Sequence, residues 1–131
     1  MTATEPQTQI TGVGTVGIPV TDQDRALAFY IDTLGFEIRM DGTFGEGFRW
    51  IEVAPPGAAT TIALVNLGAG LPTGVDTGVR LTTKNAAADH SALQARGVDV
   101  DPEIIPFPVP MFTLRDPDAN RLYVVERPEG G

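Results

Sequence analysis

The sequence contains no cysteine and only one histidine, and these absences exclude several kinds of chemistry. Without cysteine there is no disulfide, no thiolate metal ligand and no cysteine nucleophile, which suits a reducing cytoplasm. A catalytic triad that needs histidine would have to use His90. This residue lies three positions before Leu93 in a predicted helix, on the side that faces the back of a sheet, so we interpret it as structural.

Positive charge is also scarce, since nine Lys and Arg stand against seventeen Asp and Glu, for a formal net charge of −8. Binding to nucleic acid or to an anionic membrane rests largely on attraction to phosphate, so we expect neither as a partner. No apolar run approaches the roughly 20 residues of a membrane span. The polar start, residues 1–9, lacks the regions of a signal peptide, so we expect a soluble cytoplasmic protein.

The clearest helix in the sequence is expected to begin at Thr21 or Asp22 and to end before Gly35. Either residue can cap the free N–H groups, and Asp24 would complete a capping box with Thr21. Four apolar residues share one face of this helix at helical spacing: Leu27, Tyr30, Ile31 and Leu34.

The remaining pattern predicts a repeated βαβββ unit. Leu34-Gly35-Phe36 recurs as Arg96-Gly97-Val98, helix end to strand start. Strands are predicted at 13–20, 36–40, 48–53 and 60–65, with a break at Asp41-Gly42, and then at 78–82, 98–105, 111–115 and 121–126, with a second helix at 86–96. The fold class is therefore α+β, with two βαβββ modules forming a cupped mixed sheet.

The expected division of the chain is a single domain, 12–127, with short tails. It comprises a flexible polar N-terminal tail (1–11), a first module (12–66), a Gly- and Pro-rich linker (67–77), a second module (78–127) and a C-terminal tail (128–131).

Three stretches resemble the vicinal oxygen chelate superfamily, which includes glyoxalase I, bleomycin-resistance proteins and extradiol dioxygenases. They are the segment from Val16 to Tyr30, then Leu34-Gly35-Phe36, and later Asp116-Pro117-Asp118-Ala119-Asn120-Arg121-Leu122. The resemblance covers residues 12–126, although Ala119 stands where the family usually has Gly. It implies paired βαβββ modules, usually in homodimers, with a ligand site inside each cupped sheet.

The resemblance also implies where a divalent metal would be held in the family's enzymes. Carried over one by one, the four ligand positions are occupied by Thr15, Ala63, Gly78 and Tyr123. Metals of this class need imidazole nitrogen or carboxylate oxygen, and none of these side chains normally supplies a strong ligand. We therefore expect no metal and no other cofactor.

Alternation along the predicted strands indicates which side chains point into the cup. Inward positions are Thr15, Gly17, Ala63, Val65, Arg80, Thr82, Tyr123 and Val125, with Trp50 and Phe112 as possible walls. Arg80 and Tyr123 would fix a carboxylate, phenolate or carbonyl oxygen. The alternative is that Tyr123 fills the vacated metal space as core while Arg80 leans out to solvent.

Three hypotheses about function follow. The leading one is a metal-free homodimer that sequesters an apolar or aromatic small molecule in its cup, as bleomycin-resistance proteins do. The second is an enzyme, either a glyoxalase-like lyase or isomerase with a displaced site or a metal-independent catalyst that uses Tyr123 and Arg80. The third is an interaction module with a plugged cup. Glu52 is a possible general base, but we interpret it as a solvated carboxylate at a strand edge.

Overall fold

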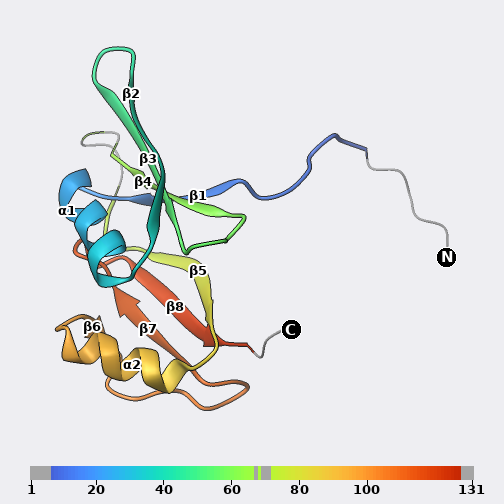
Figure 1. Ribbon diagram of the computed structural model, residues 1–131, viewed down its shortest axis with the longest axis vertical. Coiled ribbons are helices and arrows are strands. Elements are labelled where there is room, and N and C mark those ends of the chain that lie inside the picture. Colours follow the sequence, from blue (N-terminus) through green and yellow to red (C-terminus); the bar gives the residue numbers. More distant parts are fainter. Residues whose placement is uncertain (1–6, 67, 69–71, 128–131) are drawn as a thin grey trace.

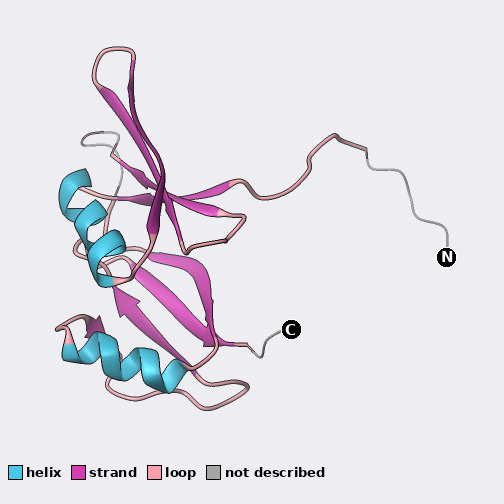
Figure 2. Ribbon diagram, viewed as in Figure 1, coloured by secondary structure: helices cyan, strands magenta, loops and turns pink. Residues whose placement is uncertain are grey.

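The computed structural model describes residues 7–66, 68 and 72–127 and contains two four-stranded mixed sheets (Figures 1 and 2). The first sheet has the order β1-β4-β3-β2, with β1 (Thr15–Pro19), β2 (Glu37–Phe44), β3 (Phe48–Ala54) and β4 (Thr61–Val65). The second has the order β5-β8-β7-β6, with β5 (Asp76–Thr83), β6 (Asp99–Val100), β7 (Met111–Arg115) and β8 (Arg121–Glu126). The predicted α+β class with two βαβββ modules is confirmed.

The first helix, α1 (Gln23–Ala28), begins at Asp22, whose side chain accepts a hydrogen bond from the Arg25 N–H. The expected capping box is wrong, because the carboxylate of Asp24 binds Arg49 instead, at 2.7 Å. The helix continues as a π-helical turn, η1 (Phe29–Thr33), in which the Leu34 N–H donates to the Phe29 carbonyl. The sequence did not predict this widening of the last turn. The chain leaves the helix at Gly35, with φ of 79°.

The second helix, α2 (Ala86–Ala95), is capped by Asn85 and followed by Gly97, which also has φ of 79°. No helix in the described part of the chain is long and apolar enough to cross a membrane.

Several strand boundaries differ from the prediction, and proline and glycine explain most of them. Asp41 and Gly42 lie inside β2, and the turn falls instead at residues 45–47, where Gly45 and Gly47 have positive φ. The predicted strand 98–105 shrinks to the two residues of β6 and an isolated bridge at Ile105, because Pro102 lacks the N–H that a strand needs. β5 begins at Asp76, two residues earlier than expected.

One apolar core joins the helix-facing sides of the two sheets. Its largest fully buried side chains include Tyr30, Ile18, Ile51 and Leu64 from the first module and Phe112, Leu114 and Leu122 from the second. In Figure 1, α1 lies beside the first sheet and α2 lies beside the second. The opposite face of each sheet carries no helix, and this leaves two sheet faces available for a site.

A buried polar cluster, the junction cluster of Tyr30, Asp116 and Asn120, joins the two modules. The Asn120 amide donates to the Pro19 carbonyl (2.7 Å) and accepts from the backbone N–H groups of Gly74 and Val75. The Tyr30 hydroxyl donates to the Asp116 carboxylate at 3.0 Å. Burial and the neighbouring Asp116 charge raise the pKa of Tyr30, so its hydroxyl remains a donor.

Removing the Tyr30 hydroxyl should therefore destabilise the fold. Because the hydroxyl is buried and binds a charged group, we expect Tyr30→Phe to lower the free energy of unfolding by about 1.5–3 kcal/mol, measured by urea denaturation. Tyr123→Phe is the matched control, since its hydroxyl bonds Asp76 at an exposed position and should cost less than about 1 kcal/mol. Equal losses in the two variants would contradict the role of the junction cluster.

Ala119 adopts a left-handed conformation in the β7–β8 turn, with φ of 64°. This conformation costs a residue with a Cβ atom roughly 1–2 kcal/mol, more than the 0.4–1 kcal/mol that glycine loses through its freer unfolded chain. We expect Ala119→Gly to raise the free energy of unfolding by about 0.5–1 kcal/mol. In the same denaturation assay Ala92→Gly, inside α2, should lower it by about 1 kcal/mol. A loss of stability in Ala119→Gly would show that the turn carries no strain.

Candidate ligand-binding site

The helix-free face of the first sheet has small residues at its centre. Ala63 pairs with Gly17 of β1 on one side and with Glu52 of β3 on the other, so the three positions form one row. Thr15 lies in the next row opposite Thr61, and Trp50 follows Glu52 on the same side of β3. The structure thus places Thr15, Trp50 and Ala63 on one face, although neighbouring side chains cover Ala63 completely.

Glu52 holds two of these side chains in place. One carboxylate oxygen accepts from the Thr61 hydroxyl at 2.6 Å, and the other accepts from the Trp50 indole N–H at 2.8 Å. These hydrogen bonds lower the pKa of Glu52. β3 lies between β2 and β4, so our interpretation of Glu52 as a carboxylate at a strand edge is wrong. The alternation that placed Trp50 would also have placed Glu52.

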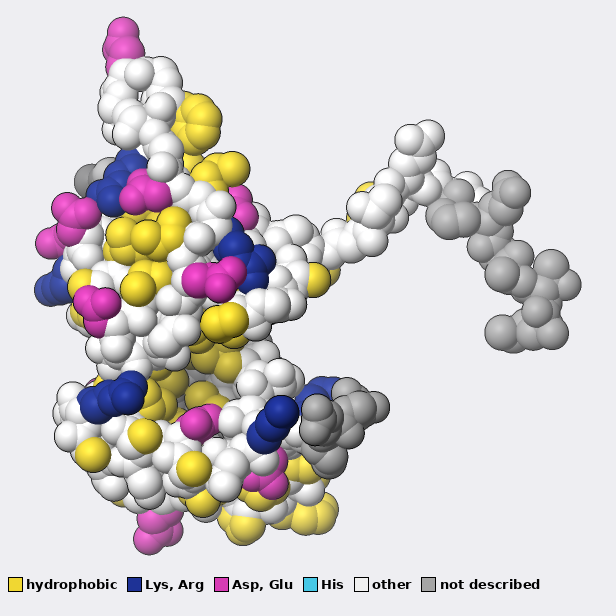
Figure 3. Space-filling view, in the orientation of Figure 1, with side chains coloured by type: hydrophobic (Ala, Val, Ile, Leu, Met, Phe, Trp, Pro, Cys, Tyr) yellow, Lys and Arg dark blue, Asp and Glu magenta, His cyan; other side chains and the backbone are white. Residues whose placement is uncertain are grey.

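Trp50 belongs to an exposed apolar surface, which we call the hairpin face. The Trp50 ring lies 6.2 Å from the Phe48 ring, between centroids. Met40 pairs with Glu52 and Phe44 pairs with Phe48, so both lie on the same side of the sheet as Trp50. Met40, Phe44 and Phe48 retain 44%, 54% and 42% of their surface exposed. The hairpin extends away from the rest of the molecule in Figure 1, and Figure 3 shows exposed hydrophobic side chains along one edge of it.

On the second sheet, Arg80 and Tyr123 face each other across the parallel pair of β5 and β8. The Arg80 guanidinium lies 4.2 Å from the centroid of the Tyr123 ring, in cation–π geometry. It also donates to the Gly78 carbonyl at 2.7 Å. The Tyr123 hydroxyl donates to Asp76 at 2.7 Å and lowers the pKa of that carboxyl. Tyr123 is half-buried and Arg80 is exposed.

A cavity of about 570 Å³ opens over this face of the second sheet. Residues 108–109 form one wall, and the sheet contributes Arg80, Thr82, Met111, Tyr123, Val125 and Glu126. Thr15, Trp50 and Ala63 lie on the other sheet and do not line this cavity. Within one chain the predicted site residues therefore form two groups.

The expected position of Phe112 as a cup wall is wrong. Phe112 pairs with Val124 and is fully buried on the helix side of the sheet, where its ring lies 5.1 Å from the His90 ring. Its neighbours Met111 and Thr113 occupy the opposite face, so the error is a register slip of one residue. His90 is buried, with Nε2 2.6 Å from the Asp101 carbonyl oxygen, which fits the structural role we expected for it.

The four positions that hold a metal in related enzymes do not fit one here. Thr15 offers a hydroxyl that lies 3.3 Å from the Thr61 carbonyl, and Tyr123 offers a phenol already bonded to Asp76. Ala63 and Gly78 offer no donor atom. Among residues 7–66, 68 and 72–127, no group of three or more His, Cys, Asp or Glu side chains is arranged to hold a metal ion.

The bond between Glu52 and the only tryptophan gives a testable pH dependence. Because the pKa of Glu52 is lowered from 4.5, its carboxylate keeps its charge at that pH and takes up a proton only as the pH falls further. We expect the Trp50 emission to change below pH 4.5, while circular dichroism still reports folded protein. In Glu52→Gln this change should be absent. The same change in the variant, or a midpoint above 4.5, would refute the assignment.

Comparisons with known proteins agree with this architecture. The family model described as the Glyoxalase/Bleomycin resistance protein/Dioxygenase superfamily matches residues 12–124. TnmS3, an antibiotic binding protein from Streptomyces sp. CB03234, is 36% identical, with a TM-score of 0.79 over 92% of this chain and 98% of that one. A superfamily member from Sphaerobacter thermophilus DSM 20745 is 35% identical, with a TM-score of 0.84 over 92% and 100%.

A third relative matches over a shorter stretch. The uncharacterized protein YetH of Bacillus subtilis (strain 168) is 40% identical over 52 residues, which is 40% of this chain and 43% of that protein. The family model matches most of the chain, and the two solved structures align with it over nearly their whole length. The chain belongs to the Glyoxalase/Bleomycin resistance protein/Dioxygenase superfamily.

Proposed function

We propose that this protein sequesters an apolar or aromatic small molecule in the cytoplasm, as a homodimer, without a metal or other cofactor. The observation that carries the proposal is that one chain presents an uncovered aromatic surface on its first sheet and, on its second sheet, a cavity lined by Arg80 and Tyr123. The hairpin face around Trp50 offers apolar contact, and the cavity at Arg80 and Tyr123 offers charge. Ligand sites typically combine an apolar lining with a few polar groups in this way.

The distribution of these two groups supports a dimer. Each chain presents a hairpin face with three exposed large apolar side chains, and monomeric proteins rarely leave such contiguous surface uncovered. Each chain also carries a half-open cavity on its second sheet. A twofold dimer would place the hairpin face of one copy over the second-sheet cavity of the other, and it would complete two equivalent cups.

The chemistry of the second sheet narrows the ligand class. The Arg80 guanidinium rests on an aromatic ring and keeps N–H donors beyond the one used by Gly78. It would therefore bind a carboxylate, phenolate or carbonyl oxygen on a flat aromatic molecule. The similarity to TnmS3, which is described as an antibiotic binding protein, supports binding of this general kind.

Binding fits the geometry better than catalysis. A general base needs an oxygen free to take a proton, but both oxygens of Glu52 accept hydrogen bonds and its pKa is lowered. The Tyr123 hydroxyl already donates to Asp76, so it is not free to polarise a carbonyl group. Because these groups already form hydrogen bonds within the protein, their geometry favours sequestration over the enzyme hypotheses.

The proposal predicts saturable binding of 1-anilinonaphthalene-8-sulfonate, an aromatic anion, by isothermal calorimetry. We expect Arg80→Met and Trp50→Ala each to weaken binding about tenfold or more, the equivalent of about 1.4 kcal/mol per site. Arg25→Met is the matched control and should leave the affinity unchanged, because Arg25 pairs with Asp118 and does not line the cavity.

Native mass spectrometry of the same samples tests the assembly and the cofactor. We expect a dimer with one probe molecule per chain and no bound metal after incubation with Zn²⁺ or Ni²⁺. If a monomer bound the probe with full affinity, the proposal that two copies share each cup would be overturned. One tightly held metal per chain, or unchanged affinity in Arg80→Met, would overturn the proposed mode of binding.

A further inference from the structure

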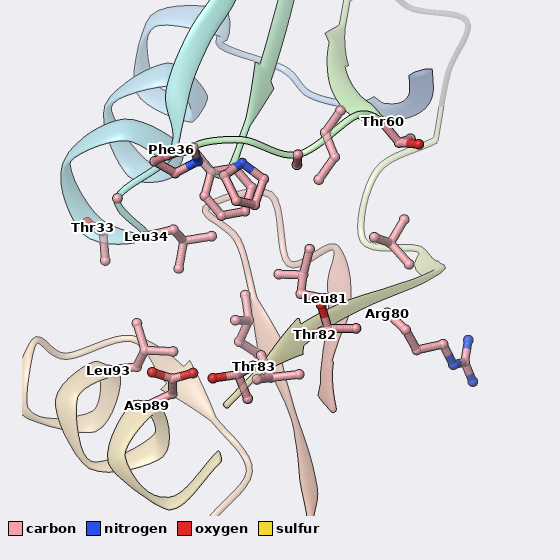
Figure 4. A pocket seen from close by; sticks show the side chains of 18 of the residues that line it. Thr33, Leu34, Phe36, Thr60, Arg80, Leu81, Thr82, Thr83, Asp89 and Leu93 are labelled. Atoms are coloured by element: carbon pink, nitrogen blue, oxygen red, sulfur yellow. The ribbon is translucent and has the colours of Figure 1, made fainter. Parts of the chain in front are cut away.

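A second and larger cavity, of about 820 Å³, lies where the two modules of one chain meet (Figure 4). We call it the inter-module cavity. Its sheet residues come largely from the helix side, with Val16 and Ile62 in the first sheet and Val79, Leu81 and Val124 in the second. Thr15, Trp50, Ala63 and Tyr123 do not line it. Arg80 lies at its rim, and its side chain points away from Leu34 and Leu93 in Figure 4.

The internal repeat explains why this space is empty. Aligning Gly35 with Gly97 matches Tyr30 of the first helical segment with Ala92 of α2. Glu52 pairs with Ala63 in the first sheet, and Thr113 pairs with Tyr123 in the second, so the two pairs are equivalent. The offset that relates Glu52 to Thr113 also relates Pro55 to Asp116. Tyr30 and Asp116 fill one of the two related junctions. At the other stand Ala92 and Pro55, and both line the cavity.

The lining is mainly apolar and includes three charged residues: Asp89, Arg80 at the rim, and Arg96, whose guanidinium donates to the Thr33 carbonyl at 2.7 Å. Leu34, Phe36, Leu81 and Leu93 surround the space, and Asp89 and Thr83 lie together near its lower edge (Figure 4). Asp89 is half-buried, and its carboxylate forms no ion pair or hydrogen bond with another residue in the described part of the chain. A carboxylate without a partner beside an apolar surface can form an ion pair with a cationic group, so a cation at this end would bind favourably.

We propose that the inter-module cavity is a second binding site, which takes a small molecule with an apolar body and a protonated amine. The amine pairs with Asp89, and the body contacts Leu34, Leu81 and Leu93. A volume of about 820 Å³ lies within the range of about 300–1,000 Å³ that is usual for small-molecule sites. The net charge of −8 also favours a cation over an anion. This site is distinct from the proposed cup, because it lies mainly on the other side of the strands and needs no second copy; Arg80 and Thr82 line both cavities.

The test uses 2-naphthylmethylamine as the probe and 2-naphthylmethanol as its neutral counterpart, with the full chain labelled for amide NMR. We expect saturable shifts at Leu34, Leu81 and Leu93 with the amine, and affinity about tenfold weaker for the alcohol. Ala92→Phe, which places a ring where Tyr30 stands in the other half, should abolish the shifts. Ala95→Phe is the matched control, since Ala95 lies in the same helix and does not line the cavity.

Two further variants keep the test decisive. Asp89→Asn preserves the shape of the site and should remove the preference for the amine. Trp50→Ala, which weakens the cup, should leave the amine affinity unchanged. Shifts confined to Trp50 and Tyr123, full binding in Ala92→Phe, or an undiminished amine preference in Asp89→Asn would each overturn the assignment.

Discussion

The arrangement of the two modules depends on a buried carboxylate, Asp116, and the groups that satisfy it. It accepts hydrogen bonds from Tyr30, from the Asn120 amide and from two backbone N–H groups of its own turn. An unpaired carboxylate at this depth would be strongly unfavourable, so the turn, the first helical segment and the start of the second module must meet in one geometry. These hydrogen bonds hold the β7–β8 turn against the first helical segment and the end of β1.

The bounds of the strands were predictable where the strands are regular and flanked by clear turn signals. The bounds of β7 and β8 match the prediction, because the dense turn at residues 116–120 fixes where both strands begin and end. Gly35 and Gly97 mark the helix ends for the same reason, since glycine adopts positive φ without strain. Turn residues and helix-ending glycines determine these features locally, so the sequence alone was sufficient to predict them.

The predictions that were wrong concern features that depend on contacts between residues far apart in the sequence. Phe112 packs against His90 in the second helix, and nothing near it in the sequence sets that register. Asp24 is taken from its expected capping role by Arg49, 25 residues away in the chain. The pattern of apolar residues in the first helical segment also gives no sign of the π-helical turn. Glu52 was misread because an interior strand and an edge strand of this length look alike until the pairing is known.

Consecutive residues of β8 line different cavities: Tyr123 lines the cavity over the helix-free face of the second sheet, and Val124 lines the inter-module cavity. This strand therefore separates the two cavities and contributes a side chain to each of them. Because side chains alternate along a strand, a substitution at Tyr123 changes the lining of the first cavity and leaves Val124 in the second as it is. A single-residue insertion in this strand, in contrast, would exchange the linings of both compartments at once.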